Sequence, residues 1–508
     1  MDGGTEWGQS EWHSDCKSIP AAGSAEPAIQ DRPMKSNSSL VDQRFRRALA
    51  LQKQGHTVEA RNEYLKVLEI DPSHGPALNN VGSLLLAAGN LPAARIAYAE
   101  AVARHPNDPV SRSNLGNLLR EEGELAAARE HYEHALRVDP NLVQAHEGLS
   151  YVLADLGDEE RAAWHRRKAF EHRFLIALPY LGKGKGISVL QLVSSNGGNV
   201  RTREFLDERV FRTFVVLPEF YDRKVALPPH QMVFNAIGDA DVAAAALTAA
   251  EPFLALTQAP VINPPSAVLA TRRLDISRRL SGLPGVVTPR TVALPREILT
   301  APDAEAALAA QGFRFPVLLR TPGFHTGDHF VRAKIPDELP AALAQLPGQQ
   351  LLAIQYLEAR GTDEKWRKYR VMMIDGKLYP LHVALSSNWK VHYFSSEMAD
   401  NSLGRAEEAQ FLANMAGVLG PRVLDALTRI QKTLGLDYGG IDFGLNRDGD
   451  LVLFEANATM VVLSPGADPR WDYRRTAVEQ IYQAVANMLL ARANAGAQHT
   501  NWSSAGAD

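Results

Sequence analysis

The chain has 508 residues, enough for two or three separate hydrophobic cores. Hydrophobic residues make up 45% and charged residues 22%, and the formal net charge of −4 gives no sign of nucleic-acid binding. The single cysteine, Cys16, excludes a disulfide bond within the chain and indicates a reducing compartment. No apolar run is long enough to cross a bilayer, and Met1 is not followed by a secretory signal, so we expect a cytoplasmic protein that binds neither membrane nor nucleic acid.

The two ends of the chain lack hydrophobic periodicity. Residues 1–40 are rich in Ser, Gly and Pro, and residues 494–508 are short and polar. Such segments cannot bury enough apolar surface to offset the entropy of ordering. We therefore expect a disordered leader and a disordered tail.

Residues 41–175 repeat with a period of 34 residues. Four kinds of residue keep this step: Gly55, Gly89, Gly123 and Gly157; Ala60, Ala94, Ala128 and Ala162; Tyr64, Tyr98 and Tyr132; Pro72, Pro106 and Pro140. The pattern resembles the tetratricopeptide repeat, a helix–turn–helix unit that stacks into an all-α solenoid. In such a unit, glycine ends the first helix, alanine lets the helices approach, tyrosine fills the seam and proline stops the second helix. We expect three full repeats and a degenerate fourth, in which Arg166 replaces the tyrosine.

Polar residues gather on the face that the first helix of each repeat presents to the inside of the solenoid. Asn79, Asn80, Asn114, Asn117 and Arg120 lie there, with Asn80 and Asn114 one period apart. Because amides hydrogen-bond to extended backbone, a groove for a peptide or protein partner is one interpretation, with Asn80, Asn114 and Asn117 as its contacts. The other is that these asparagines cap or brace neighbouring helices.

The pattern changes after residue 180. Short β-rich runs at 187–193, 211–217 and 231–237 alternate with a helical segment at 239–256. This alternation predicts an α/β domain with a mostly parallel sheet over 180–270. The loop SSNGGNV after the first run is either a phosphate-cradling loop or a plain strand-to-helix turn.

Residues 437–460 read as two strands joined by the turn Arg447-Asp448-Gly449-Asp450. If the strands pair, Asp442, Glu455 and Asn457 converge. Two carboxylates and an amide supply the oxygen ligands that Mg²⁺ accepts together with phosphate and water. The alternative is a surface hairpin with solvated acids.

This hairpin, DFGLN followed by LVLFEANATM, resembles the metal-binding end of an ATP-grasp ligase of the glutathione synthetase and ribosomal-protein glutamate ligase type. The resemblance implies a multidomain chain, in which the all-α solenoid is followed by an α/β pre-ATP-grasp domain at 180–270 and an α+β ATP-grasp domain at 271–493. It also implies that Asp442, Glu455 and Asn457 hold Mg²⁺, with Mn²⁺ as a substitute, against the phosphates of ATP.

The same resemblance implies a set of nucleotide-binding residues. Arg273, on a basic helix, is the closest match to a lysine that reaches phosphate, although an exposed helix face explains its four arginines almost as well. Arg320 ends a strand where relatives carry a phosphate-binding lysine. The backbone of Gln355, Tyr356 and Leu357 would pair with the adenine edge, and the side chains of Tyr356 and Leu357 would sandwich the ring.

The following hairpin would carry the reaction. Arg370 matches the arginine that relatives aim at the γ-phosphate and the acyl phosphate. Lys368 stands where close relatives carry an acid that contacts the nucleotide, so that contact is altered here. Asn388, Lys390 and His392 come next and suggest a site for a second substrate or an anionic intermediate; a solvated edge strand is the alternative.

Together, these features predict an ATP- and Mg²⁺-dependent carboxylate–amine ligase that acts through an acyl phosphate. The repeats would dock a peptide or protein substrate, and a small-molecule acid or amine is also compatible. Two alternatives stay open: a non-catalytic, nucleotide-binding interaction scaffold, and an ATP-grasp kinase that phosphorylates a hydroxyl. The identities of the acid and the amine, and the oligomeric state, do not follow from the residues.

Overall fold

The computed structural model describes residues 36–323, 327–391 and 397–503. The chain folds as two compact units, Met1–Phe174 with Phe220–Asp222, and Leu175–Glu219 with Arg223–Asp508. Cys16 and most of the expected leader lie outside the described residues. No helix in the described part of the chain is both long enough and apolar enough to span a membrane.

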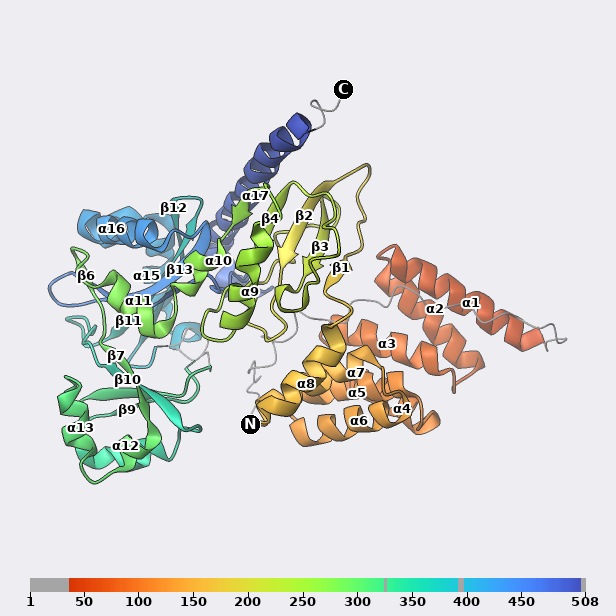
Figure 1. Cartoon of the computed structure of the whole chain (residues 1–508), viewed down its shortest axis with the longest axis horizontal. Helices are drawn as coiled ribbons and strands as arrows, with labels where there is room; N and C mark the ends of the chain where they lie inside the picture. Colours follow the sequence, from red (N-terminus) through yellow and green to blue (C-terminus); the bar gives the residue numbers. More distant parts are fainter. Residues whose placement is uncertain (1–35, 324–326, 392–396, 504–508) are drawn as a thin grey trace. The chain divides into compact units, whose positions relative to one another are not determined.

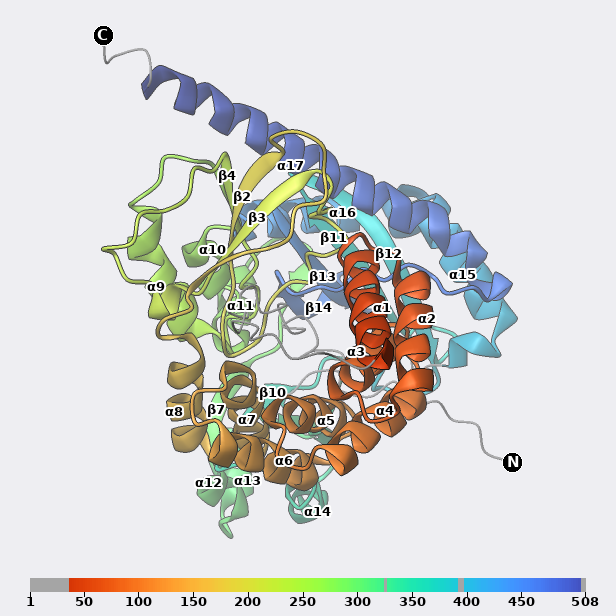
Figure 2. The ribbon, with the colours of Figure 1, turned by 90° about the vertical axis from the view of Figure 1, so that its right-hand side faces the viewer.

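The first unit is built from helices that pack as successive antiparallel pairs and follow one another in an arc (Figure 2). Their bounds are α1 (Ser36–Lys53), α2 (Thr57–Ile70), α3 (Gly75–Ala87), α4 (Leu91–Arg104), α5 (Pro109–Glu121), α6 (Leu125–Val138), α7 (Val143–Asp155) and α8 (Glu159–Phe170). Helix α1 begins before residue 41, so the leader predicted over 1–40 is wrong for its last residues. The fourth repeat forms a complete helical pair despite Arg166.

The repeat residues act as the sequence predicts. Gly89 and Gly123 have φ of 76° and 78°, the left-handed conformation that ends a helix. The four repeated alanines are all fully buried. Tyr132, also fully buried, packs so closely that a Cβ on Gly148 would lie 2.3 Å from its ring, and a Cβ on Gly116 would lie 3.0 Å away. The tyrosine of one helix therefore packs directly against the backbone of a glycine on a neighbouring helix, where a Cβ would clash with its ring.

The second unit begins with a five-stranded sheet in the order β1-β3-β2-β4-β5 (Figure 1). The strands are β1 (Leu175–Ala177), β2 (Ile187–Leu192), β3 (Phe211–Val216), β4 (Met232–Asn235) and β5 (Val261–Ile262). All neighbours pair in parallel except β1 with β3, as predicted for this segment. Helix α9 (Ala244–Leu254) follows β4, but the described residues between β2 and β3 contain no helix, so the strand-to-helix turn expected after β2 is wrong.

A four-stranded antiparallel sheet comes next, in the order β7-β10-β8-β9. Its strands are β7 (Thr291–Pro295), β8 (Val317–Arg320), β9 (Phe330–Ala333) and β10 (Gln350–Gln355), and its helices are α12 (Arg296–Thr300), α13 (Ala304–Ala310) and α14 (Leu339–Leu343). Buried side chains from these strands and helices form a core of their own.

A third sheet has the order β12-β11-β13-β14-β6. Its strands are β6 (Val286–Val287), β11 (Trp366–Ile374), β12 (Lys377–Ser386), β13 (Tyr438–Leu445) and β14 (Leu451–Asn457). Helices α10 (Pro265–Leu269) and α11 (Arg273–Leu280) precede it, and α15 (Ser402–Ala413) and α16 (Met415–Leu434) lie between β12 and β13.

The closing helix α17 (Arg475–Ser503) joins the first and third sheets. Its apolar residues, among them Ile481 and Val485, share one buried core with Phe234 of β4 and Met372 of β11. This helix continues past residue 494, so the tail predicted to be disordered from that point is helical as far as Ser503. The segments that we expected as separate domains, 180–270 and 271–493, are thus held by a common core.

Candidate functional site

The hairpin of β13 and β14 brings the three candidate metal ligands onto one face. Asp442 pairs with Glu455 across the strands, and Asn457 lies two residues beyond Glu455. Paired residues of antiparallel strands point to the same side, as do residues two apart on one strand. The Asn457 amide donates to Glu455 Oε1 at 2.9 Å. The three side chains therefore project from the same face of the hairpin, while their convergence on a metal ion stays a prediction.

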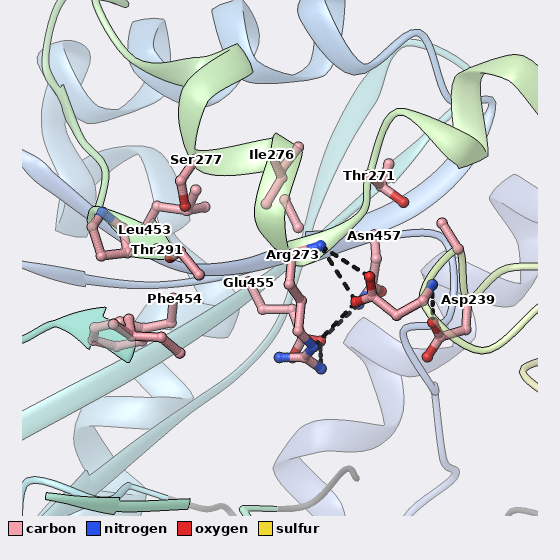
Figure 3. A pocket seen from close by; sticks show the side chains of 15 residues that line it. Asp239, Thr271, Arg273, Ile276, Ser277, Thr291, Leu453, Phe454, Glu455 and Asn457 are labelled. Atoms are coloured by element: carbon pink, nitrogen blue, oxygen red, sulfur yellow. Dashed lines mark hydrogen bonds and ion pairs between the residues drawn. The ribbon is translucent and has the colours of Figure 1, made fainter. Parts of the chain in front are cut away.

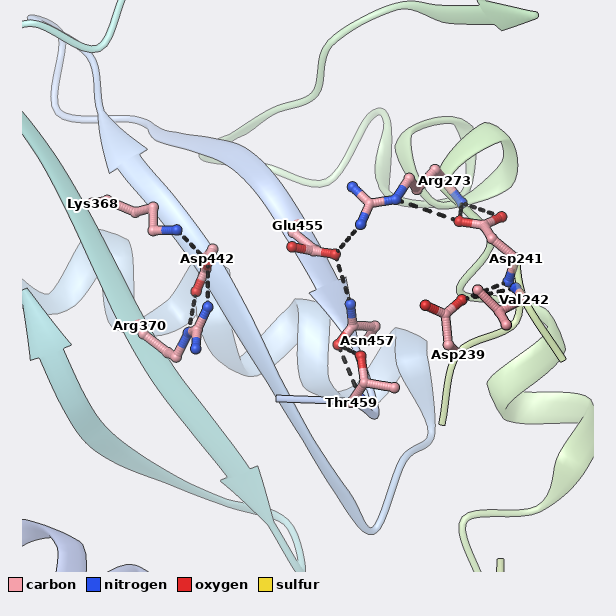
Figure 4. A network of polar contacts seen from close by, with 10 residues as sticks. All are labelled: Asp239, Asp241, Val242, Arg273, Lys368, Arg370, Asp442, Glu455, Asn457 and Thr459. Carbon is pink, nitrogen blue, oxygen red and sulfur yellow. Dashed lines mark hydrogen bonds and ion pairs between the residues drawn. The ribbon is translucent and has the colours of Figure 1, made fainter. Parts of the chain in front are cut away.

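Asp442 is held by two cations from β11 (Figure 4). Arg370 donates to both carboxylate oxygens, at 2.6 and 2.8 Å, and the Lys368 ammonium lies 2.9 Å from Oδ2. Asp442 is only 1% exposed. Burial opposes its charge, but Arg370 and Lys368 outweigh burial and hold the pKa of Asp442 well below its usual range.

Arg273 ties Glu455 to the loop after β4. Its guanidinium donates to Glu455 Oε1 at 2.6 Å and lies 3.5 Å from Asp241 (Figure 4). The other arginines of this helix turn elsewhere: Arg278 bonds Asp275 and Arg279 bonds a carbonyl of α16. Arg273 therefore reaches the hairpin, which separates it from a merely exposed helix face.

Arg320 ends β8 and is 8% exposed. Burial lowers the pKa of its guanidinium to about 10, helped by the nearby charge of Arg273, while Glu455 and Asp241 oppose the shift. Arg320 thus stays charged at neutral pH and belongs to the same electrostatic cluster. Its guanidinium also lies over the ring of Phe330, 5.5 Å from the centroid.

A small pocket opens beside this cluster (Figure 3). Asp239, Arg273, Glu455 and Asn457 line its polar side, and Phe454 lies on its apolar side. Its volume of about 50 Å³ holds a few water molecules and is well below the 300 to 1,000 Å³ usual for ligand clefts. With its side chains in these positions, the pocket is too small for a nucleotide.

One of the backbone groups predicted to pair with the adenine edge is engaged within the chain. The Gln355 N–H donates to the Arg290 carbonyl at 2.8 Å, because this residue is still part of the sheet. The adenine contact of this segment stays a prediction for its other backbone groups. Tyr356 and Leu357 follow the strand, and the guanidinium of Arg332 lies over the Tyr356 ring at 5.3 Å. One face of the Tyr356 ring is therefore covered by Arg332.

The predicted second-substrate residues follow the edge strand β12. Asn388 is exposed, and the Lys390 ammonium donates to the carbonyl of Phe330 on β9 at 3.1 Å. His392 lies outside the described residues. The structure therefore favours an exposed edge for Asn388, and Lys390 contacts the small sheet.

In the repeats, the candidate groove asparagines have structural partners. Asn114 donates to Asn79 at 3.2 Å, and Asn117 accepts from the Tyr132 hydroxyl at 2.6 Å. Asn80 is half-buried, within hydrogen-bonding reach of the Tyr64 hydroxyl. Bracing of neighbouring helices is thus observed for these residues, and peptide contact stays a prediction.

Sequence reasoning missed two acids of the cluster. Asp239 and Asp241 follow β4 in the run GDAD, and both line the pocket. Burial, with the charge of Asp239, raises the pKa of Asp241. Two acids directly after a buried parallel strand were the available signal, because carboxyl ends of such strands meet at one sheet edge. Even with these acids, the described residues contain no group of three His, Cys, Asp or Glu side chains arranged to hold a metal ion.

Comparisons with known proteins identify the repeats. A family model described as tetratricopeptide repeat matches residues 45–109, and one described as TPR repeat matches 116–157. The N-terminal unit therefore contains TPR repeats, which indicate protein–protein interaction. A search of curated proteins finds no match.

Solved structures similar to this chain overlap about a quarter of it. They include MamA from Desulfovibrio magneticus RS-1 (25% identity, 26% of this chain and 74% of that one, TM-score 0.24) and pilF of Pseudomonas aeruginosa (22%, 28% and 64%, 0.26). A third is the first TPR of Spaghetti (RPAP3) bound to an HSP90 peptide (23%, 24% and 95%, 0.23). We draw nothing about function from similarities with TM-scores this low.

Proposed function

We propose that the C-terminal unit is an ATP- and Mg²⁺-dependent carboxylate–amine ligase of the ATP-grasp type. The observation that carries this proposal is the gathering of four cations around the acids of the β13/β14 hairpin. The cations come from three separate segments: Arg273 from α11, Arg320 from β8, and Lys368 and Arg370 from β11. Phosphoryl transfer needs mainly positioning and charge stabilisation, and this cluster offers both.

The charge balance of the cluster suits a phosphate ligand. Arg370 binds both oxygens of Asp442, Arg273 binds one oxygen of Glu455, and a guanidinium fork can also bind phosphate oxygens in a bidentate way. When a nucleotide enters, Arg273 can turn from Glu455 to phosphate, and Arg370 can keep Asp442 and offer phosphate the N–H groups that do not bind it. Arg320 adds a further charge beside them, in the position where a lysine is usual.

The fit to magnesium is uneven among the predicted ligands. Glu455 has a side chain that is 26% exposed at the pocket edge, but its Oε1 accepts from Arg273 and from the Asn457 amide, and the Asn457 oxygen accepts from Thr459, so these side chains would have to turn before the pair could hold a cation. Asp442 already has both oxygens engaged by Arg370 and Lys368. If Mg²⁺ were bound there, it would supply positive charge that offsets the charge of the phosphates.

The reaction proposed for this site has two steps. A substrate carboxylate attacks the γ-phosphate of ATP to give an acyl phosphate and ADP, and Arg370 stabilises the transferring group. The neutral amine then attacks the acyl carbon, phosphate leaves with the electron pair of the C–O bond, and the proton lost by the nitrogen passes to phosphate or water as the amide forms. The chain itself supplies orientation, charge and exclusion of water, and no nucleophilic side chain is required.

The repeats give the reason to propose a peptide or protein as one substrate. TPR repeats indicate protein–protein interaction, and a docked chain would raise the local concentration of its reactive group. A small-molecule acid or amine would then be the second substrate.

ADP release tests the proposal. Purified protein is screened with ATP, Mg²⁺ and pairs of acids and amines, peptides included, and each product is weighed by mass spectrometry. The variant Glu455→Gln should abolish substrate-dependent ADP release, while Asp448→Asn, in the exposed turn of the same hairpin, should not. Turnover that survives Glu455→Gln would reject the assignment.

One observation favours a second candidate. Lys368 and Arg370 already engage the carboxylate of Asp442, and Arg320 stands where ATP-grasp relatives carry a lysine. The unit is therefore also compatible with a non-catalytic nucleotide-binding scaffold. The product separates the possibilities: an amide for a ligase, a phosphorylated hydroxyl for a kinase, and none for a scaffold.

A further inference from the structure

The first unit has a pocket of its own, which we call the outer pocket. Leu149 and Leu153 of α7, both almost fully buried, form its apolar floor, and Arg137 of α6 and His165 of α8 lie on its rim. Its volume of about 280 Å³ is close to the lower end of the roughly 300 to 1,000 Å³ usual for ligand clefts. Because α6 and α8 are the second helices of their repeats, the outer pocket lies on the face opposite to the predicted asparagine groove.

His165 offers this pocket a hydrogen-bond acceptor. The Nε2 atom of His146 lies 2.9 Å from the Pro140 carbonyl, which can only accept, so this Nε2 carries hydrogen. In a neutral His146 the Nδ1 atom then accepts, and His165 Nδ1, 2.8 Å away, donates to it. Burial lowers the pKa of His165 to about 4, so His165 is neutral at pH 7. Its Nε2 atom is left as an acceptor with no partner among the described residues.

The α6 side of the outer pocket has excess positive charge. Two charged residues of the lining, Glu133 and Arg161, each form an ion pair at 2.7 Å with a nearby residue. In the described part of the chain, neither Arg137 nor the neighbouring Arg112 of α5 forms an ion pair with a carboxylate. Burial, together with the charge of Arg137, lowers the pKa of Arg112. A carboxylate bound beside the two arginines would relieve their mutual repulsion.

The leader of the chain contains a segment with matching chemistry, TEWGQSEWHSD. Trp7 and Trp12 each directly follow a glutamate, Glu6 and Glu11, and no lysine or arginine precedes Lys17. Polar, charged segments without a core usually contain few aromatic residues, so two tryptophans here indicate a binding segment. An indole combines an apolar body with one N–H donor, which matches a leucine floor beside a histidine acceptor.

We propose that the outer pocket binds a Glu-Trp pair of the leader of the same chain. The indole lies on the two leucines and donates to His165 Nε2, and the glutamate faces Arg112 and Arg137. The segment from Trp12 to Ser36, where α1 begins, can span about 80 Å. Since neighbouring helices pack about 10 Å apart, α8 lies at most about 70 Å from α1, within that reach. Attachment to the same chain also raises the effective concentration of the leader.

A spin label tests the proposal on the full chain, because Cys16 is its only cysteine and follows Trp12 closely. A nitroxide is attached to Cys16, and its mobility is measured by electron paramagnetic resonance. We expect a slow component in the wild type that falls several-fold in Arg137→Glu and in the double variant Trp7→Ala with Trp12→Ala. Arg104→Glu, the same charge change at an exposed position on α4, should leave the spectrum unchanged.

Three results would overturn the inference. A wild-type label as mobile as that of the double tryptophan variant would mean that the leader does not dock. A slow component that survives in folded Arg137→Glu would place the docked leader elsewhere. A slow component that disappears on dilution would assign the docked leader to a second copy of the chain. If circular dichroism shows that Arg137→Glu does not fold, Arg137→Gln replaces it, with the same expected loss.

Discussion

The two units of this protein hold their polar side chains in different ways. In the repeats, the partners are near in sequence: the Tyr132 hydroxyl donates to Asn117, 15 residues away. In the hairpin site, they are far apart: Arg370 binds Asp442 across 72 residues, and Arg273 binds Glu455 across 182. Because the partners in the repeats are local, the stability of the repeats is approximately a sum over similar units. The partners in the hairpin site are distant in sequence, so the geometry of that site depends on the folding of the whole second unit.

The largest effect should come from removing the charge of Asp442. Asp442→Asn leaves Lys368 and Arg370 buried without their counter-ion, and breaking a buried ion pair in this way costs about 3–5 kcal/mol. We expect the second unit to unfold at much lower urea concentration while the repeats keep their own transition. The change is measured by urea unfolding followed by fluorescence and circular dichroism.

Glu455→Gln is the matched control, because the Glu455 side chain is 26% exposed, whereas that of Asp442 is 2% exposed. Its cost should be about 1 kcal/mol, as for an ordinary partly exposed pair. Equal losses for the two variants would mean that Asp442 is no more structural than Glu455, and the contrast between them would disappear.

A smaller effect is expected in the repeats, from Gly148→Ala. Alanine is the better helix former by about 1 kcal/mol, so this change would stabilise an open helix. At Gly148 a Cβ would lie 2.3 Å from the Tyr132 ring, and overpacking costs about 1–3 kcal/mol. We therefore expect a net loss of stability in the first unit.

Gly116→Ala sharpens this test, because there the Cβ would lie 3.0 Å from the same ring. That contact requires only a small shift of the tyrosine, so the variant should stay close to the wild type in thermal unfolding. If both variants are stabilised, the tyrosine seam does not depend on bare glycine backbone.

The same contrast explains which features of the structure can be predicted from the sequence. The period of the repeats predicts the turn glycines, the buried alanines and the tyrosine seam because each rule acts within one or two helices. The alternation of apolar residues likewise predicts β13 and β14, and so the pairing of Asp442 with Glu455. It does not predict that Lys368 joins Asp442, because that contact depends on the pairing of β11 with β13, two strands far apart in the chain.

Other failures have local causes. The Gln355 N–H is engaged by the Arg290 carbonyl because β10 extends as far as Gln355. Asp239 and Asp241 were overlooked because the run around them reads as the start of a helix, whereas α9 begins only at Ala244. The tail was expected to be disordered on composition, yet its alanines continue α17.

The third prediction concerns acid and the repeats. The Nδ1 atoms of His146 and His165 lie 2.8 Å apart, and His146 also bonds the Pro140 carbonyl. Burial lowers the pKa of His165 to about 4, helped by His146 and Arg161, while Glu133 on α6 opposes the shift. The folded state therefore binds fewer protons than the unfolded state, whose histidine has a pKa of about 6.5.

The contribution of His165 to the free energy of unfolding is fully present above pH 6.5 and falls as the pH drops toward about 4. Because His165 is partly exposed, we expect a loss of only about 1 kcal/mol in the first unit. His165→Gln should flatten the dependence between these two pH values in thermal unfolding. The same slope in the variant would assign the acid sensitivity to other groups.

The smallest effect on stability should come from Asn80→Ala combined with Asn114→Ala. This double variant is also the most direct test of the predicted peptide groove. Their observed contacts are half-buried or long, so the double variant should lose no more than about 1 kcal/mol. If the asparagines also hold a substrate peptide, the KM for a peptide substrate should rise several-fold while the KM for a free amino acid and kcat stay unchanged. Asn141→Ala, in an exposed loop between repeats, serves as the control. If these residues bind the peptide, their loss must raise the KM for the peptide substrate. An unchanged KM for the peptide would therefore leave these residues only their observed role in bracing the helices.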